Sequence, residues 1–121
     1  MSVFIVAEAG STCKGDLDTA MKLVDAAKDA GADAIKFIMS DPDELIADKS
    51  IKYGDKNLYD IIKSYQFKDD EEWRILSQYC EEKEIAFYVS IGTRNYIPLA
   101  ESLDIPIYKI GAWDLRNKYL I

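Results

Sequence analysis

Short apolar runs alternate along the chain with segments whose apolar residues recur at helical spacing. The runs are rich in β-branched and aromatic residues, a pattern that predicts buried strands. The intervening segments carry apolar residues three and four positions apart, which predicts amphipathic helices. The expected strands are 3–7, 34–39, 85–90 and 107–110, and the expected helices are 17–30, 58–65, a longer one after 69, and 96–103. Residues 40–56 are polar and are expected to form a loop.

Two of the expected helices carry recognisable end signals. Asp16 precedes the first helix as an N-cap, and Gly31 follows it in the position that favours a left-handed residue. Asp69 precedes the long helix, and Glu72 stands at the spacing of a capping box. These local signals support helices over 17–30 and after residue 69.

The alternation of strands and helices implies right-handed crossovers and a parallel sheet. A small doubly wound sheet and part of a (β/α)8 barrel both fit this order. Residues 119–121 begin a further amphipathic segment, which favours the barrel, and a complete barrel needs about 250 residues. We therefore expect the α/β class, with residues 1–121 forming one partial TIM-barrel domain. Its parallel β/α units would be the first four, about half of the barrel.

The composition narrows the classes of function. Lys plus Arg number 15 and Asp plus Glu number 22, so the net charge is −7, which argues against non-specific nucleic-acid binding. No apolar run approaches the roughly 20 residues of a membrane span, and the apolar start lacks the basic residues of a signal peptide. We therefore expect a cytoplasmic protein with no nucleic-acid or membrane partner.

The chain contains two cysteines and no histidine. Cys13 and Cys80 are too few for a disulfide framework, so we expect two free thiols. The lack of histidine excludes every His-dependent catalytic triad and removes the commonest metal ligand. The acidic run 69–72 is interpreted as a helix N-terminus, so no metal-binding residue is predicted.

Three charged residues interrupt the apolar strands: Glu8, Lys36 and Lys109. Parallel sheets bind ligands at the carboxyl ends of their strands. If these side chains face the barrel interior, two ammonium groups and a carboxylate converge at its mouth and suit a phosphate or carboxylate anion. The alternative is a structural salt bridge between Glu8 and one lysine, because an unpaired buried charge costs several kcal/mol.

Two further polar residues follow strands. Ser90 closes the third strand, and its hydroxyl, with the backbone N–H groups beside Gly92, is suited to a phosphate oxygen; the alternative is a strand-to-helix cap by Ser90 or Thr93. Asp114 follows the fourth strand and is a candidate acid or base. The residue type favours the alternative for Asp114, a helix N-cap ahead of Leu115.

Five segments in order resemble the sialic acid synthase (N-acetylneuraminate synthase) family, which includes nonulosonic-acid and spore-coat polysaccharide synthases. They are FIVAEAG at 4–10, GDLDTAMKLVDAAKDAGADAIKF at 15–37, LYDIIK at 58–63, EEWRILSQYCEEKEIAFYVS at 71–90 and LDIPIYKIG at 103–111. The resemblance implies a TIM-barrel transferase that condenses phosphoenolpyruvate with an N-acetyl amino sugar. Phosphoenolpyruvate C3 attacks the sugar aldehyde, water adds at C2, phosphate leaves, and a divalent metal (Mn or Mg) polarises the aldehyde.

The resemblance also implies roles for five residues. Lys36 and Lys109 match the family's phosphoenolpyruvate-binding lysines, and Ser90 stands where a threonine makes another such contact. Glu8 matches a substrate-side acid or base. Asp114 falls at the glutamate of the family's Ser-Gly-Glu.

The sequence departs from the family pattern at several positions. Thr12-Cys13 replaces Asn-His, Ile38 replaces Gln, Ile91-Gly92 replaces Pro-Phe, and Ala112-Trp113-Asp114 replaces Ser-Gly-Glu. The family's metal-binding histidines match no residue of this chain, so we expect this chain alone to hold no metal. The departures indicate either lost activity or an altered acceptor.

Two functions therefore remain open. The first is a synthase domain, part of a carbohydrate-biosynthesis enzyme, whose isolated chain is incomplete and inactive. The second is a non-catalytic half-barrel that binds an anion or serves in assembly. A four-strand half-barrel has two open edges, so in either case we expect a homodimer or larger assembly.

Overall fold

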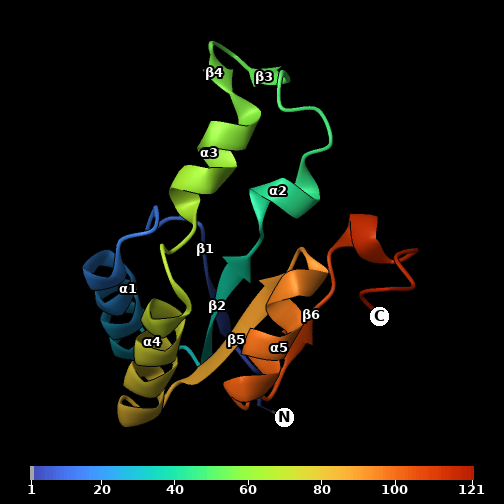
Figure 1. Ribbon diagram of the computed structural model, residues 1–121. Helices are drawn as coiled ribbons and strands as arrows, with labels where there is room; N and C mark the ends of the chain where they lie inside the picture. The colour runs from blue at the N-terminus through green and yellow to red at the C-terminus, as the bar shows by residue number, and fades with distance from the viewer. Residues whose placement is uncertain (1) are drawn as a thin grey trace.

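The computed structural model describes residues 2–121, and its centre is a four-stranded parallel sheet (Figure 1). The sheet order is β1 (Val6–Gly10), β2 (Ala34–Met39), β5 (Ala86–Ile91) and β6 (Tyr108–Lys109). Each strand is added beside its predecessor, on the same side. This is the strand order of a barrel, whereas a doubly wound sheet reverses direction at a switch point. The partial-barrel prediction is confirmed.

Three helices lie on one side of the sheet: α1 (Leu17–Asp29), α4 (Asp70–Glu82) and α5 (Ile97–Ser102) (Figure 1). The predicted caps are present. The Asp16 carboxylate accepts a hydrogen bond from the Thr19 N–H at 2.8 Å, and Asp69 and Glu72 form a complete capping box. Gly31 follows α1 with φ +80°, as its predicted C′ role requires.

The core lies between these helices and one face of the sheet. Alternation along the strands points every second side chain toward the helices. The most deeply buried side chains of this layer are Val24, Ile35, Phe37, Met39, Leu76, Cys80 and Val89. The opposite face, called the inner face below, carries Glu8 and Lys36 instead.

The first strand begins three residues later than predicted. Ile5 still interacts with the segment before β2, since its N–H donates to the Asp33 carboxylate at 2.7 Å and its carbonyl accepts from the Ala34 N–H at 3.2 Å. The strand ladder itself starts only at the pair Val6↔Ala34. The apolar run marked the strand, but pairing with β2 decided its limits.

The predicted loop over 40–56 contains regular structure. It holds α2 (Pro42–Leu45) and a small antiparallel hairpin of β3 (Lys52–Tyr53) and β4 (Lys56–Asn57), followed by the predicted short helix α3 (Leu58–Tyr65). Figure 1 shows this excursion standing beyond the end of β2. Asp41 caps α2 through the Asp43 N–H at 2.8 Å, and Pro42 occupies the first helical turn, which explains this short helix.

The end of the chain also differs from expectation. After β6 comes a single 3-10 turn, η2 (Ala112–Asp114), and no α-helix forms between residues 110 and 121. The amphipathic segment expected from residue 119 is not helical, although Leu120 packs against the core. A second 3-10 turn, η1 (Arg94–Tyr96), leads into α5. Within residues 2–121, no helix is long and apolar enough to cross a membrane.

Candidate functional site

The sheet register brings polar side chains together on the inner face. Glu8 pairs with Lys36 across β1 and β2, and Lys36 pairs with Tyr88 across β2 and β5. Two residues after Tyr88 on β5, Ser90 pairs with Lys109 of β6. Side chains paired in register or two residues apart share a face. These five residues are called the inner-face site below.

Lys36 is the centre of the inner-face site. The residue is only 8% exposed, and its ammonium group forms an ion pair with the Glu8 carboxylate. Its Nζ also donates to Ser90 Oγ at 3.2 Å. Ser90 lies two positions beyond the register partner of Lys36, so the lysine side chain leans toward the carboxyl ends of the strands. The salt bridge considered as the structural alternative has therefore formed.

Lys109 behaves differently. It is exposed at the end of β6, and none of the ion pairs among residues 2–121 includes it. Register still places it on the same face as Lys36, next to Ser90. The site thus holds one cation neutralised by Glu8 and a second cation that faces solvent.

The strand-to-helix cap by Ser90 or Thr93, considered above as the alternative to a phosphate contact, does not form at the end of β5. Strand β5 continues one residue past Ser90, whose hydroxyl accepts from Lys36. Thr93 occupies the N-cap position of η1 without a side-chain cap, because its Oγ1 instead accepts from the Asp41 N–H at 2.9 Å. That contact ties the excursion after β2 to the loop after β5.

Asp114 is buried but does not join the inner-face residues. It ends η2, whose N-cap position is occupied by Gly111, so the predicted N-cap role of Asp114 is wrong. Its Oδ1 accepts a long hydrogen bond from Asn117 Nδ2 at 3.4 Å. Its Oδ2 is buried and has no partner among residues 2–121. Buried carboxylate oxygens without a donor are rare in folded proteins.

Tyr88 is the inner-face residue that sequence reasoning missed. It is 8% exposed, and burial followed by the negative charge of Glu8 raises the pKa of its hydroxyl. The phenol therefore stays protonated and remains a hydrogen-bond donor. Its position two residues before Ser90, on the same strand face, was the available signal.

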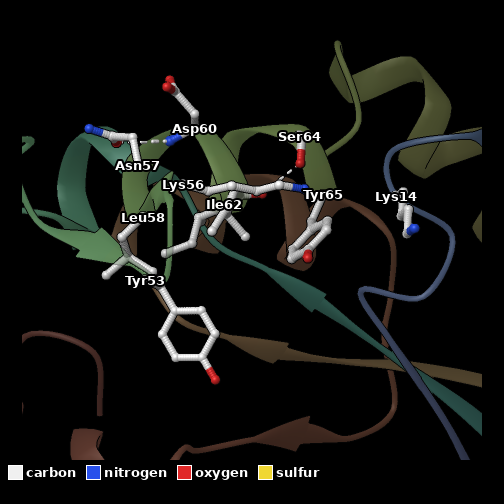
Figure 2. Close-up of a pocket in the computed structure, with 10 residues that line it drawn as sticks. Lys14, Tyr53, Lys56, Asn57, Leu58, Asp60, Ile62, Ser64 and Tyr65 are labelled. Atoms are coloured by element: carbon white, nitrogen blue, oxygen red, sulfur yellow. Dashed lines mark hydrogen bonds between the residues drawn. The ribbon is translucent and has the colours of Figure 1, made fainter.

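An open pocket of about 910 Å³ lies beside α3 and the β3–β4 hairpin (Figure 2). Figure 2 shows the rings of Tyr53 and Tyr65 extending to the same side of α3, with Lys14 across from them. None of the inner-face residues lines it. The loop that carries Lys14 lies against the backbone at the end of α3. This close approach requires glycine at position 15, because a side chain at Gly15 would collide with the Gln66 carbonyl.

The described residues do not fit a metal ion. No group of three or more Cys, Asp or Glu side chains within residues 2–121 is placed to hold one. At the inner-face site a single carboxylate stands among two lysines, a donor set that repels cations. Cys13 and Cys80 are buried free thiols, and burial raises the pKa of Cys80 to about 12.

Comparisons with known proteins agree with this architecture. The NeuB family model matches residues 23–121. The spore coat polysaccharide biosynthesis protein SpsE of Bacillus subtilis is 32% identical over 125 residues, covering 98% of this chain and 33% of the relative. N-acetylneuraminate-9-phosphate synthase of Homo sapiens is 31% identical over 121 residues, and the match covers 94% of this chain and 33% of the relative.

A solved structure of a related protein also matches nearly the whole of this chain. The crystal structure of N-acetylneuraminic acid synthetase from Leptospira borgpetersenii, in complex with citrate, superposes with a TM-score of 0.84 at 29% identity. The match covers 97% of this chain and 39% of that one. The chain spans about a third of the length of the curated relatives it matches.

Proposed function

Since the chain belongs to the NeuB family, we propose that it is a sialic acid synthase-like domain whose inner face binds phosphoenolpyruvate. The whole reaction would condense phosphoenolpyruvate with an N-acetyl amino sugar. The observation that carries this proposal is the shared face of Lys36, Ser90 and Lys109.

This arrangement matches the chemistry of the ligand. Phosphoenolpyruvate carries a phosphate and a carboxylate, and each ammonium group can donate charge-assisted hydrogen bonds worth roughly 1.5–3 kcal/mol. The Ser90 hydroxyl, already beside Lys36, supplies a further polar contact. Lys109 is exposed, and none of the ion pairs among residues 2–121 occupies its ammonium group.

Glu8 has two roles in this proposal. In the empty site it neutralises Lys36, which makes a nearly buried ammonium group tolerable. In the bound site its half-exposed carboxylate is the substrate-side acid or base. Asp114, which lies outside the inner-face site, is the second proposed acid or base, and its buried Oδ2, without a partner among residues 2–121, is the feature that supports this role.

Turnover is not proposed for the chain by itself. The family reaction uses a divalent metal at the acceptor aldehyde, and the described residues do not fit one. The isolated chain would bind phosphoenolpyruvate without consuming it. The amino-sugar acceptor and a second copy of the chain, or a larger assembly, are its further proposed partners.

A non-catalytic half-barrel is the second candidate function. The specific observation in its favour is the sequence Ala112-Trp113-Asp114, where the family has Ser-Gly-Glu. Such a module would bind an anion at the same lysines and serve in assembly. Phosphoenolpyruvate binding therefore supports both candidates, and turnover in a longer chain separates them.

Thermal unfolding with and without phosphoenolpyruvate tests the anion site. Phosphoenolpyruvate is expected to raise the melting temperature of the unmodified chain. Lys36→Met, which keeps the buried stem and removes the charge, and Lys109→Ala should each abolish the rise. Lys22→Ala, an exposed lysine on α1, is the matched control and should retain it. An equal rise in all the variants would contradict the proposal.

A further inference from the structure

An apolar side chain stands among the polar groups of the inner-face site. Ile38 is half-buried on β2, which has a strand on each side of it, β1 and β5. It follows Lys36 by two positions on the same face, and its register partner is Ser90 of β5. Ile38 therefore lies one step closer to the carboxyl ends of the strands than the paired residues Lys36 and Glu8.

Gly10 leaves the space beside Ile38 free of a side chain. It is the last residue of β1, next to β2. A Cβ atom placed on Gly10 would lie 3.8 Å from Ile38 Cδ1 and 3.3 Å from Glu8 Oε1. The end of the isoleucine side chain and one carboxylate oxygen thus lie near the same point, where glycine leaves both uncovered.

The groups that would hold an anion lie on the other side of Ile38. Lys36 Nζ donates to Ser90 Oγ at 3.2 Å, and Lys109 pairs in register with Ser90. An anion bound by the two ammonium groups therefore lies toward β5 and β6. The part of the same ligand that is turned toward β1 meets the Ile38 side chain and Gly10.

We propose that Ile38 is a specificity-determining residue, which makes the inner-face site select phosphate esters whose terminal carbon is apolar. The inference rests on the phosphoenolpyruvate site proposed above and adds a property to it. Phosphoenolpyruvate has such a carbon, the methylene C3, whereas 2-phosphoglycerate carries a hydroxyl at this position. A hydroxyl turned toward Ile38 loses hydrogen bonds to water and gains none from the isoleucine.

The Glu8 carboxylate changes this balance little. Its side chain is 56% exposed, so a ligand hydroxyl that donated to Oε1 would replace a hydrogen bond from water with one of similar strength. The apolar contact with Ile38 would be lost in either case. An apolar carbon keeps that contact and leaves the Glu8 oxygen hydrated.

Calorimetric titration of the full chain with two matched esters tests the inference. 2-Phospholactate and 2-phosphoglycerate of matched configuration carry the same charges and differ only in the hydroxyl on C3. The unmodified chain is expected to bind 2-phospholactate at least about fivefold tighter, a ratio within reach of a hydrophobic contact that rejects a hydroxyl. Equal affinities for the two esters would overturn the inference.

Two variants of nearly equal size assign the selectivity to Ile38. Ile38→Val keeps an apolar, β-branched side chain and should keep the preference for 2-phospholactate. Ile38→Thr has the same shape but offers a hydroxyl to that of 2-phosphoglycerate, so the preference should fall below about twofold. Circular dichroism confirms that each variant is folded. A preference that survives Ile38→Thr would overturn the inference.

Failure of the anion site itself gives a different result. If neither ester nor inorganic phosphate binds the unmodified chain, the proposed phosphoenolpyruvate site is wrong and the inference is overturned with it. If both esters bind equally and Lys36→Met abolishes their binding, the site exists and only the role of Ile38 is wrong.

Discussion

Lys36 of β2 is nearly buried on the inner face of the sheet, and its ammonium group is paired with the half-exposed carboxylate of Glu8. The same ammonium group donates to Ser90. A single lysine thus joins three strands at the point where an anion is proposed to bind. Removing its carboxylate partner leaves a desolvated charge without compensation.

Glu8→Gln is expected to lower stability and to tighten anion binding. The loss should be about 1 kcal/mol, less than for a fully buried pair because water screens the exposed Glu8. Phosphate should bind several-fold tighter, since the carboxylate no longer competes for Lys36. Urea denaturation and calorimetric titration measure the two effects.

Asp43→Asn is the control for that variant. Asp43 pairs with Lys49 at 2.5 Å, but both side chains are more than half exposed and lie away from the inner face. It should change neither stability nor phosphate affinity appreciably. Weaker phosphate binding in Glu8→Gln would show that Glu8 assists the anion rather than competing with it.

The isolated chain is expected to make no nonulosonic acid. Incubation with phosphoenolpyruvate, an N-acetyl hexosamine and manganese should leave a thiobarbiturate assay at background, because residues 2–121 do not fit a metal ion. A full-length relative is the positive control. Product formation at ordinary enzyme rates would contradict the expectation and place the missing ligands within this chain or its assembly.

Asp69→Ala is expected to destabilise the fold by about 1 kcal/mol, because it removes the N-cap of α4 and half of a capping box. The midpoint of urea unfolding reports the change. Glu71→Ala, in the same first turn, makes no capping contact and should cost only a few tenths of a kcal/mol. Equal effects of the two variants would assign the role to the helix dipole instead.

Acid is expected to weaken the contact between α1 and α4. A hydrogen bond from Lys83 and another from the Tyr79 hydroxyl hold the pKa of Asp25 below its usual value of 3.8. A lowered folded-state pKa adds stability above the unfolded pKa, and this stability is lost as pH falls through the folded pKa. The difference in melting temperature between the unmodified chain and Asp25→Asn should therefore shrink below about pH 4. A difference that is constant from pH 7 to pH 3 would contradict this.

Local features were readable from the sequence. The caps of α1 and α4 depend on residues within a few positions of each other, so Asp16, Gly31, Asp69 and Glu72 sufficed. Strand β2 was located to the residue because turn signals bound its apolar run on both sides. Interactions between residues close in the sequence determine these elements, so the elements could be predicted without knowledge of the fold.

Other features depended on pairing. The start of β1 was set by β2, and the small hairpin after β2 lacks an apolar pattern, so neither could be read from local spacing. Asp114 looked like a cap in sequence but lies buried at the end of a 3-10 turn. Tyr88 looked like strand packing until register placed it beside Lys36.

The sequence by itself determined which charged residues interrupt apolar strands, and therefore that Glu8, Lys36 and Lys109 needed an explanation. Only the tertiary structure decided which of these three residues form an ion pair with each other. Register across the four strands placed Glu8 against Lys36 and put Lys109 beside Ser90, in none of the ion pairs among residues 2–121. Ion pairing depends on distances of a few ångströms between segments far apart in the chain, and the sheet alone sets those distances.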